Sequence, residues 1–108
     1  MTLAQARRYA LSLPETREEP HFERTSFRVR GKIVATALPD DGYLNVFVGD
    51  EHREPALALH PDYIEKLMWG GKAVGLRISL GDASMAVVKD LLLLAWREKA
   101  PKSLKIRT

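Results

Sequence analysis

His21 and its neighbours are the residues best placed for chemistry by type and spacing. His21 lies between Glu19 and Glu23, two positions from each. In an extended segment, side chains two residues apart point to the same side, so all three could face one ligand. A metal ion needs further ligands in good geometry, and His52 and His60 are far away in the sequence. We therefore expect His21 to hold a loop by hydrogen bonds, and we expect neither a metal site nor an enzymatic activity.

A second group of chemistry-bearing residues is basic. Arg28 and Arg30 share one side of an expected strand, Arg24 stands near its start, and Lys32 follows the next turn. Phosphate contacts need only positive charge and reach, so this group predicts salt-sensitive, sequence-tolerant binding of nucleic acid. In the alternative, long arginine side chains cover an exposed sheet and pair with nearby carboxylates. The candidate nucleic-acid-binding residues are Arg24, Arg28, Arg30, Lys32, Lys72, Arg77, Lys102 and Lys105.

Three aromatic residues near this group, Phe22, Tyr43 and Phe47, could stack on the bases of a single strand. Aromatic side chains are more often buried, so we expect these three in the core. Other catalytic patterns do not stand out: there is no Ser-His-Asp order and no pair of catalytic carboxylates. The segment 70–72, Gly-Gly-Lys, lacks the leading glycine and the following Ser or Thr of a phosphate-binding loop.

The net charge of +3 is unevenly distributed along the chain. Residues 1–32 carry +3, residues 33–62 carry −5 and residues 63–108 carry +5. Residues 97–108 alone hold five Lys or Arg against Glu98, a basic tail of the kind that contacts polyanions. The alternative for this tail is a solvated terminus that keeps the protein soluble.

Length and composition indicate one folded domain over residues 1–108, with the basic tail at 101–108. The chain has 108 residues, of which 45% are hydrophobic and 29% charged, values typical of globular domains. The absence of cysteine excludes disulfides, zinc ribbons, iron–sulfur clusters and a thiol nucleophile. No signal-peptide pattern opens the chain, and the longest apolar run, 91–96, is far shorter than the roughly 20 residues that cross a bilayer. We expect a cytoplasmic monomer without a cofactor or a membrane segment.

Periodicity places these residues on an α+β framework. Helical spacing after a Thr2 cap predicts a helix that Pro14 ends, and a loop is expected over 15–23. Alternation predicts strands over 26–30, 32–38 and 43–48, which form a meander on short turns.

The second half of the chain completes this framework. We expect a short helix over 55–59, an irregular or helical segment over 63–68, a strand over 73–80 and a long last helix to about Lys99. The result is an antiparallel sheet, a meander plus a further strand, with the two terminal helices packed on one face. The other face can remain in water, and we expect function there.

A family resemblance rests on segment 18–22, Glu-Glu-Pro-His-Phe, and on segment 25–36, which contains an Arg-Gly-Lys hairpin. These segments closely resemble the signature stretch of the MmcQ/YjbR family of small bacterial proteins. Further matches are the first helix to Pro14, Trp69-Gly70, and the closing helix that ends in Ala-Pro-Lys at 100–102, so the resemblance covers essentially the whole chain. The resemblance implies a compact fold akin to the frataxin/CyaY-like architecture and a DNA-binding role that rests on fold analogy.

Two departures from the pattern limit what the resemblance implies. Relatives often carry a longer Gly-Trp-Gly passage and an aromatic residue that enters the last strand, whereas this chain has Gly-Lys-Ala-Val-Gly over 71–75. Frataxins hold iron on an acidic first helix, whereas this helix carries Arg7 and Arg8, so metal binding is not carried over. We predict a non-enzymatic DNA-binding module, with a protein-interaction or small-ligand module as the alternative.

Overall fold

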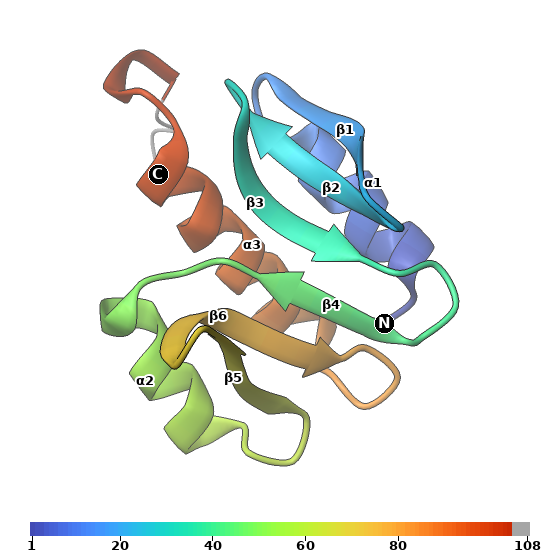
Figure 1. Ribbon diagram of the computed structural model, residues 1–108, viewed down its shortest axis with the longest axis vertical. Helices are drawn as coiled ribbons and strands as arrows, with labels where there is room; N and C mark the ends of the chain where they lie inside the picture. The colour runs from blue at the N-terminus through green and yellow to red at the C-terminus, as the bar shows by residue number, and fades with distance from the viewer. Residues whose placement is uncertain (105–108) are drawn as a thin grey trace.

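One six-stranded antiparallel sheet organises the chain (Figure 1). The computed structural model describes residues 1–104, and the strand order in the sheet is β1-β2-β3-β4-β6-β5. In chain order the elements are α1 (Leu3–Ser12), β1 (Thr16–His21), β2 (Arg24–Val29), β3 (Lys32–Ala37), β4 (Tyr43–Val46), α2 (Asp50–Leu59), β5 (Ile64–Trp69), β6 (Lys72–Ser79), α3 (Met85–Lys99) and the 3-10 turn η1 (Lys102–Leu104). The α+β class and the antiparallel sheet expected from the sequence are confirmed.

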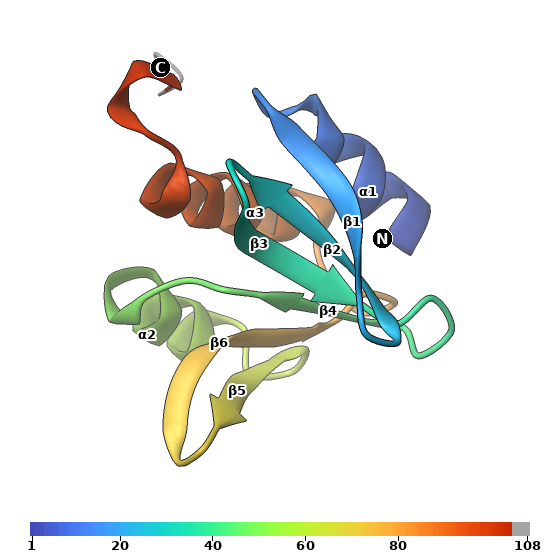
Figure 2. The ribbon, with the colours of Figure 1, turned by 45° about the horizontal axis from the view of Figure 1, so that its top comes forward.

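Helices α1 and α3 lie side by side on one face of the sheet, as the two ribbon views show (Figure 1, Figure 2). Helix α2 lies at the end of the molecule next to β5. Among residues 1–104, no helix covers the opposite face, which we call the open face. The expectation that the terminal helices share one face and leave the other open is thus confirmed, with α2 as an additional flanking element.

Helix α1 begins where the sequence predicts. The Thr2 hydroxyl accepts a hydrogen bond from the Gln5 backbone N–H, and the Gln5 side chain accepts one from the Thr2 N–H, which makes a capping box. Ala6 and Ala10, one helical turn apart, are buried toward α3 and the sheet. Small residues at these positions allow the helix to approach its neighbours closely.

The core fills the space between the helices and the sheet. Alternate residues of the strands, among them Phe27, Leu44 and Ile78, are fully buried there. Trp96 of α3 is also fully buried, and its indole N–H donates to the Pro14 carbonyl at 3.1 Å. This bond satisfies the polar group of a large apolar side chain and ties α3 to the end of α1.

Two segments expected to be irregular are edge strands. Residues 16–21 form β1, paired with β2 from Thr16 opposite Val29 to His21 opposite Arg24. Residues 64–69 form β5, paired with β6. The expected loop over 15–23 and the expected irregular or helical segment over 63–68 were therefore wrong, because both strands form by pairing with a neighbour and not by a local alternation pattern. Pro20 is compatible with β1 because an edge strand has one side without a partner strand.

Helix α2 is longer than expected. It begins at Asp50 instead of Pro55, so Pro55 lies inside the helix and not in its first turn. The early start depends on a distant residue: Glu98 of α3 accepts hydrogen bonds from the N–H of Gly49, the residue that caps α2. Such a contact cannot be found by reading residues 50–59 alone.

Candidate functional site

A row of polar residues crosses the open face, one from each strand. Strand pairing places its members directly opposite one another: Glu19, Ser26, Thr36, Asn45, Arg77 and Glu65. The three central members are buried, with exposed fractions of 0% for Ser26, 3% for Thr36 and 7% for Asn45. The open face is therefore hollowed at its centre and is not a flat solvated surface.

Most polar groups of this row have partners. The Ser26 hydroxyl donates to the Glu19 carbonyl at 2.8 Å, and the Asn45 amide nitrogen donates to the Thr36 hydroxyl at 3.3 Å. The amide oxygen of Asn45 is buried and has no hydrogen-bond donor within the described chain. Buried acceptors without a donor are rare in folded proteins, so the Asn45 side chain is a place to look for a ligand.

The hollow has two compartments that share His21, Arg24 and Trp69. The outer hollow has a volume of about 490 Å³ and is further lined by Phe22, Glu23 and Leu38. The inner hollow, about 200 Å³, extends to the central polar row and is further lined by Thr36, Asn45, Phe47, Leu67, Met68 and Val74. The coiling of the sheet thus brings the β1–β2 turn and the end of β5 to one concavity, although three strands, β3, β4 and β6, separate them in the sheet order.

Two aromatic side chains at the outer hollow are exposed to solvent. Phe22 is 96% exposed and Trp69 is 75% exposed. Phe22 has a φ of 57° in the tight β1–β2 turn, and its ring meets the His21 ring edge to face at 5.0 Å. The expected core position of Phe22 was wrong, because the turn directs its side chain away from the helices. The sequence does not single out Trp69 as a site residue, and its position before two glycines at the tip of a hairpin is the signal that could have done so.

Tyr43 and Phe47, also expected in the core, are only partly buried. Tyr43 carries the Arg77 guanidinium 3.6 Å above its ring, and Phe47 lines the inner hollow. The expectation of core positions was therefore wrong for these two residues as well, because both lie on the side of β4 that faces away from the helices.

Arg28 is held on the open face by three hydrogen bonds. Its Nε donates to the Ser26 hydroxyl at 2.9 Å, and one terminal nitrogen lies 3.1 Å from Nδ1 of His21. The third bond, 3.4 Å long, goes to the Gly31 carbonyl. His21 therefore holds its turn against Arg28, in agreement with the loop-holding role expected from the sequence. Within residues 1–104, no three His, Asp or Glu side chains form a group suited to a metal ion.

Two candidate cations are paired with carboxylates. Arg30 lies in the β2–β3 turn and binds both Glu15 oxygens, at 2.7 and 3.0 Å. The hydrogen bond from Arg30 lowers the pKa of Glu15, and the reciprocal bond raises the pKa of Arg30. Arg77 pairs with Glu65 at 3.0 Å. These two arginines fit the alternative reading, in which strand arginines cover a sheet and pair with acids, although the acids differ from those nearest in sequence.

The remaining candidates have different positions. Arg24 lines both compartments of the hollow, and Lys72 lies directly opposite Trp69 across the β5–β6 turn, on the same face of the sheet. Within the part of the chain that the structure describes, no carboxylate lies within ion-pair distance of Arg24, Arg28 or Lys72. Lys32 is exposed at the start of β3, and Lys102 is exposed in η1 beyond α3, apart from the residues that line the hollow. Lys105 lies outside the described residues.

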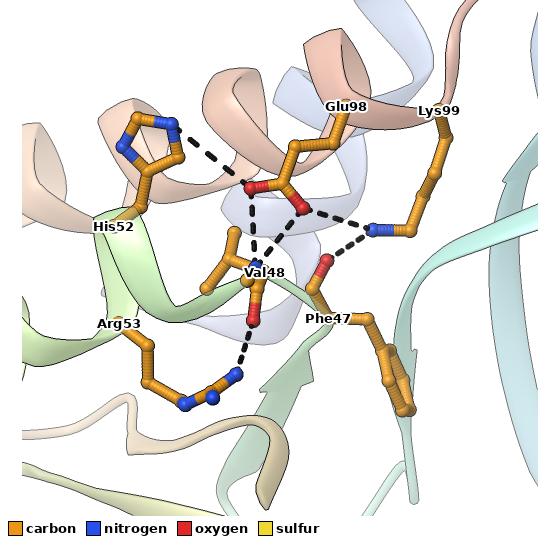
Figure 3. Close-up of polar contacts among 7 residues, drawn as sticks. Phe47, Val48, His52, Arg53, Glu98 and Lys99 are labelled. Atoms are coloured by element: carbon orange, nitrogen blue, oxygen red, sulfur yellow. Dashed lines mark hydrogen bonds and ion pairs between the residues drawn. The ribbon is translucent and has the colours of Figure 1, made fainter.

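The position of Phe47 in the inner hollow is fixed by neighbouring elements. Its backbone N–H donates to the Val34 carbonyl at 3.0 Å, and its own carbonyl accepts a hydrogen bond from the Lys99 ammonium of α3 (Figure 3). Gly75 of β6 leaves room for the backbone of residues 46–47, since a Cβ at this position would lie 2.3 Å from the Val46 carbonyl oxygen and 3.0 Å from Cα of Phe47. Burial lowers the pKa of Lys99, and the nearby Glu98 opposes that effect.

Figure 3 shows that the last turn of α3 also holds the segment that leads into α2. The Glu98 carboxylate accepts from the Gly49 N–H at 3.0 and 3.1 Å and lies 4.0 Å from the His52 ring. The buried Arg53 side chain donates to the Val48 carbonyl at 2.8 Å. These contacts join α3, α2 and the end of β4, and they give the cluster a structural role in support of the hollow.

Comparison with known proteins gives a family and a fold. A family model described as YjbR matches residues 11–98, a range that includes both hairpins that border the hollow. The crystal structure of Deinococcus radiodurans protein DR2400, with family-model domain DUF419, is similar with a TM-score of 0.77 and 22% sequence identity, over 95% of this chain and 84% of that chain. The comparison with curated proteins gives no match. Among the described residues, the helices are too short or too polar to cross a membrane.

Proposed function

The chain belongs to the YjbR family, and from this premise we propose that it is a non-enzymatic module that binds single-stranded nucleic acid across the open face of the sheet. The observation that carries the proposal is the exposure of Phe22 and Trp69 at one hollow, together with Arg24, which lines both compartments and has no carboxylate partner within residues 1–104. Stacking platforms beside cationic groups are typical of proteins that hold single strands.

The aromatic residues supply the larger part of the expected affinity. A large ring that is 96% or 75% exposed gains little from the folded protein itself and remains free to stack on a ligand. Stacking of one base on such a ring contributes about 1–3 kcal/mol and tolerates any base. Phe22 and Trp69 line the same hollow from opposite hairpins, so they can contact neighbouring bases of one strand.

The cations supply phosphate contacts. Arg24, Arg28 and Lys72 lie on the same face as the exposed rings and have no carboxylate within ion-pair distance in residues 1–104. Arginine and lysine bind phosphate oxygens without regard to base sequence. Arg30 and Arg77 contribute less, because each would have to give up an existing carboxylate partner.

A single strand fits this surface better than a duplex does. Bases in a duplex are stacked on one another and show only their edges in the grooves, whereas exposed rings in a concavity need unstacked bases. In the described part of the chain, the open face also presents no helix that could enter a major groove. We therefore propose that the nucleic acid bound by the open face is single-stranded and not a duplex.

The test is fluorescence anisotropy with a labelled 12-mer of thymidine and with a labelled duplex, at several salt concentrations. Trp69→Ala and Phe22→Ala should each weaken binding of the single strand by about 1–3 kcal/mol, since each removes one stacking surface. Leu59→Ala is the matched control, because Leu59 is 73% exposed but belongs to α2, away from the hollow. Absence of binding at about 50 mM salt, or equal losses for Leu59→Ala and Trp69→Ala, would refute the proposal.

A small-ligand module is the second candidate, and the volume of the outer hollow favours it. Sites for small molecules usually measure about 300–1,000 Å³, are mostly apolar and contain a few polar groups. The outer hollow, at about 490 Å³, falls in this range. If the oligonucleotides do not bind, the small-ligand module becomes the preferred function.

We further propose that the module acts as a monomer and in the cytoplasm. The support for the location is the absence of cysteine from the sequence, which suits a reducing compartment.

A further inference from the structure

We propose that the inner hollow receives one nucleobase of the bound strand and that Asn45 recognises the polar edge of that base. The inference rests on the proposed function and adds to it a site of recognition. The outer rings can stack on any base. The inner hollow is lined by Asn45, whose amide can distinguish a base that offers a hydrogen-bond donor from a base that does not.

Asn45 is one of three described residues with a buried side-chain polar atom that has no partner; the other two, Thr16 and Arg53, do not line the inner hollow. Asn45 is 7% exposed, its amide nitrogen donates to the Thr36 hydroxyl, and its amide oxygen is buried without a donor in the described chain. An unpaired buried acceptor destabilises the folded state, and an apolar side chain of similar size would avoid that cost. The oxygen has almost no area accessible to water, so a ligand that donates an N–H to it must displace part of the wall of the inner hollow, and the new bond would then remove the deficit.

The form of the amide suits a base edge. The Asn45 nitrogen carries two hydrogens, of which the bond to Thr36 uses one. The amide therefore offers an acceptor next to a donor, the pattern by which asparagine pairs with two adjacent groups on a base. Both groups of the ligand must lie in one plane, as they do on the ring of a nucleobase.

The walls of the inner hollow suit a flat ring. Phe47, Leu67 and Val74 are apolar, and Trp69 is shared with the outer hollow. The volume of about 200 Å³ accommodates one ring, and Arg24, which lines both compartments, is placed to meet the phosphate that joins an inner base to an outer one. A strand that stacks on Phe22 and Trp69 could thus direct one base inward.

The two tryptophans make the site observable. Trp96 is fully buried in the core, whereas Trp69 is 75% exposed and lines both compartments. A change of tryptophan fluorescence on addition of a nucleic acid would therefore report mainly on the hollow. In the Trp69→Phe variant only Trp96 remains as a tryptophan, so the fluorescence change on addition of nucleic acid should disappear.

The deciding experiment uses two oligonucleotides with the same phosphates and similar stacking surfaces. One is a 12-mer of thymidine, and the other is a 12-mer of N3-methylthymidine, in which a methyl group replaces the N–H donor. Wild-type protein should bind the first about tenfold more tightly, the size expected for a bidentate pair with a base. The double variant Thr36→Val with Asn45→Leu replaces both hydrogen-bond partners by apolar groups, so it should fold with unchanged or greater stability. It should bind both oligonucleotides with equal affinity.

The outcomes separate this inference from the proposed function. If the wild type binds neither oligonucleotide, the proposed function fails and the inference falls with it. If the wild type binds both equally, and Trp69→Ala still weakens binding, the strand is held by the outer rings and the inference alone is wrong. If the double variant keeps the tenfold preference for the thymidine 12-mer, Asn45 does not recognise the base, and the inference is again wrong.

Discussion

At the residue scale, the open face depends on a few side chains that are held by atoms from other strands. Arg28 is fixed between His21 and Ser26, and it is therefore presented in one orientation instead of moving freely in solvent. Such preorganisation reduces the entropy that a phosphate contact would otherwise cost. Gly75 and Lys99 have a comparable role for Phe47, since both act on the backbone that carries the ring.

Gly75→Ala should destabilise the protein. Its added Cβ would overlap the Val46 carbonyl oxygen and press on Phe47, and backbone atoms cannot move aside as a flexible side chain would. We expect a decrease in the free energy of unfolding of about 1–3 kcal/mol, the usual cost of overpacking, measured by urea denaturation. Gly81→Ala is the matched control, because nothing lies within 4 Å of a Cβ there and its φ is not positive. Equal stability of the two variants would contradict this account of Gly75.

Lys99 should give the fold a dependence on alkaline pH. Burial lowers its pKa in the folded protein below the ordinary value of 10.5, so between these two values the unfolded chain binds more protons than the folded one. Stability contributed by Lys99 therefore rises as the pH rises through this window, and it is lowest when both states are protonated. The difference in free energy of unfolding between wild type and Lys99→Met should shift in favour of the wild type from neutral pH toward 10.5. A difference that is constant with pH, or that shifts the other way, contradicts the assigned burial.

At the element scale, the end of α3 determines how the chain leaves the sheet. Glu98 caps α2, and the neighbouring Lys99 binds the carbonyl of Phe47, so one helical turn fixes both the start of α2 and a wall of the inner hollow (Figure 3). An anionic group at a helix N-terminus is favourable, because the first N–H groups of a helix have no partner within it. Asp50 and Glu51 place negative charge in the first turn of α2, but the cap residue Gly49 has no side chain to accept a hydrogen bond, and Glu98 supplies that acceptor.

Glu98→Ala should loosen α2 and the segment before it. We expect a loss of about 1 kcal/mol in the free energy of unfolding, comparable with the removal of other helix caps. Amide hydrogen exchange should become faster at Gly49 and in the first turn of α2, while the exchange of β2 and β3 stays unchanged. Asp90→Ala, which removes an exposed carboxylate from the same helix, serves as the control. Faster exchange spread evenly over the chain would argue against a local cap.

At the scale of the whole molecule, the open face and the helix-covered face have different roles. The helices cover the apolar side of the sheet (Figure 2). The other side carries the hollow, the exposed rings and three cations without carboxylate partners in the described chain. The acidic residues in the middle of the sequence lie mainly on α2 and in the turn before β4, which follows Leu38 of the outer hollow. The positive charge of the open face therefore rests on three side chains, in a chain whose net charge is only +3.

The three cations of the open face predict the salt dependence of binding. If Arg24, Arg28 and Lys72 each neutralise one phosphate of a single strand, the slope of log K against log salt should be about −2. Lys72→Ala should reduce the magnitude of the slope by about 0.7, whereas Lys66→Ala, an exposed lysine of β5 that lies opposite core-facing Leu76, should leave it unchanged. A slope near zero, or equal effects of the two lysines, would show that phosphates are not bound at the open face.

The sequence by itself determined the elements whose signals are local. Helix α1 follows from its cap and periodicity, α3 from its apolar stripe, and the strands β2, β3, β4 and β6 from alternation between turn residues. The YjbR resemblance also rested on linear motifs, and the match over residues 11–98 confirms it. The chemical types of the site, cations beside aromatic residues, were visible in the same way.

Only the tertiary structure decided which of these residues meet. The edge strands β1 and β5 exist because a neighbouring strand offers hydrogen bonds, and the hollow exists because the coiled sheet brings Phe22 and Trp69 together across three strands. The same pairing buries Asn45 and gives Arg30 and Arg77 their acidic partners. These features depend on contacts between residues distant in the chain, and a local pattern of residue types contains no information on register or on coiling.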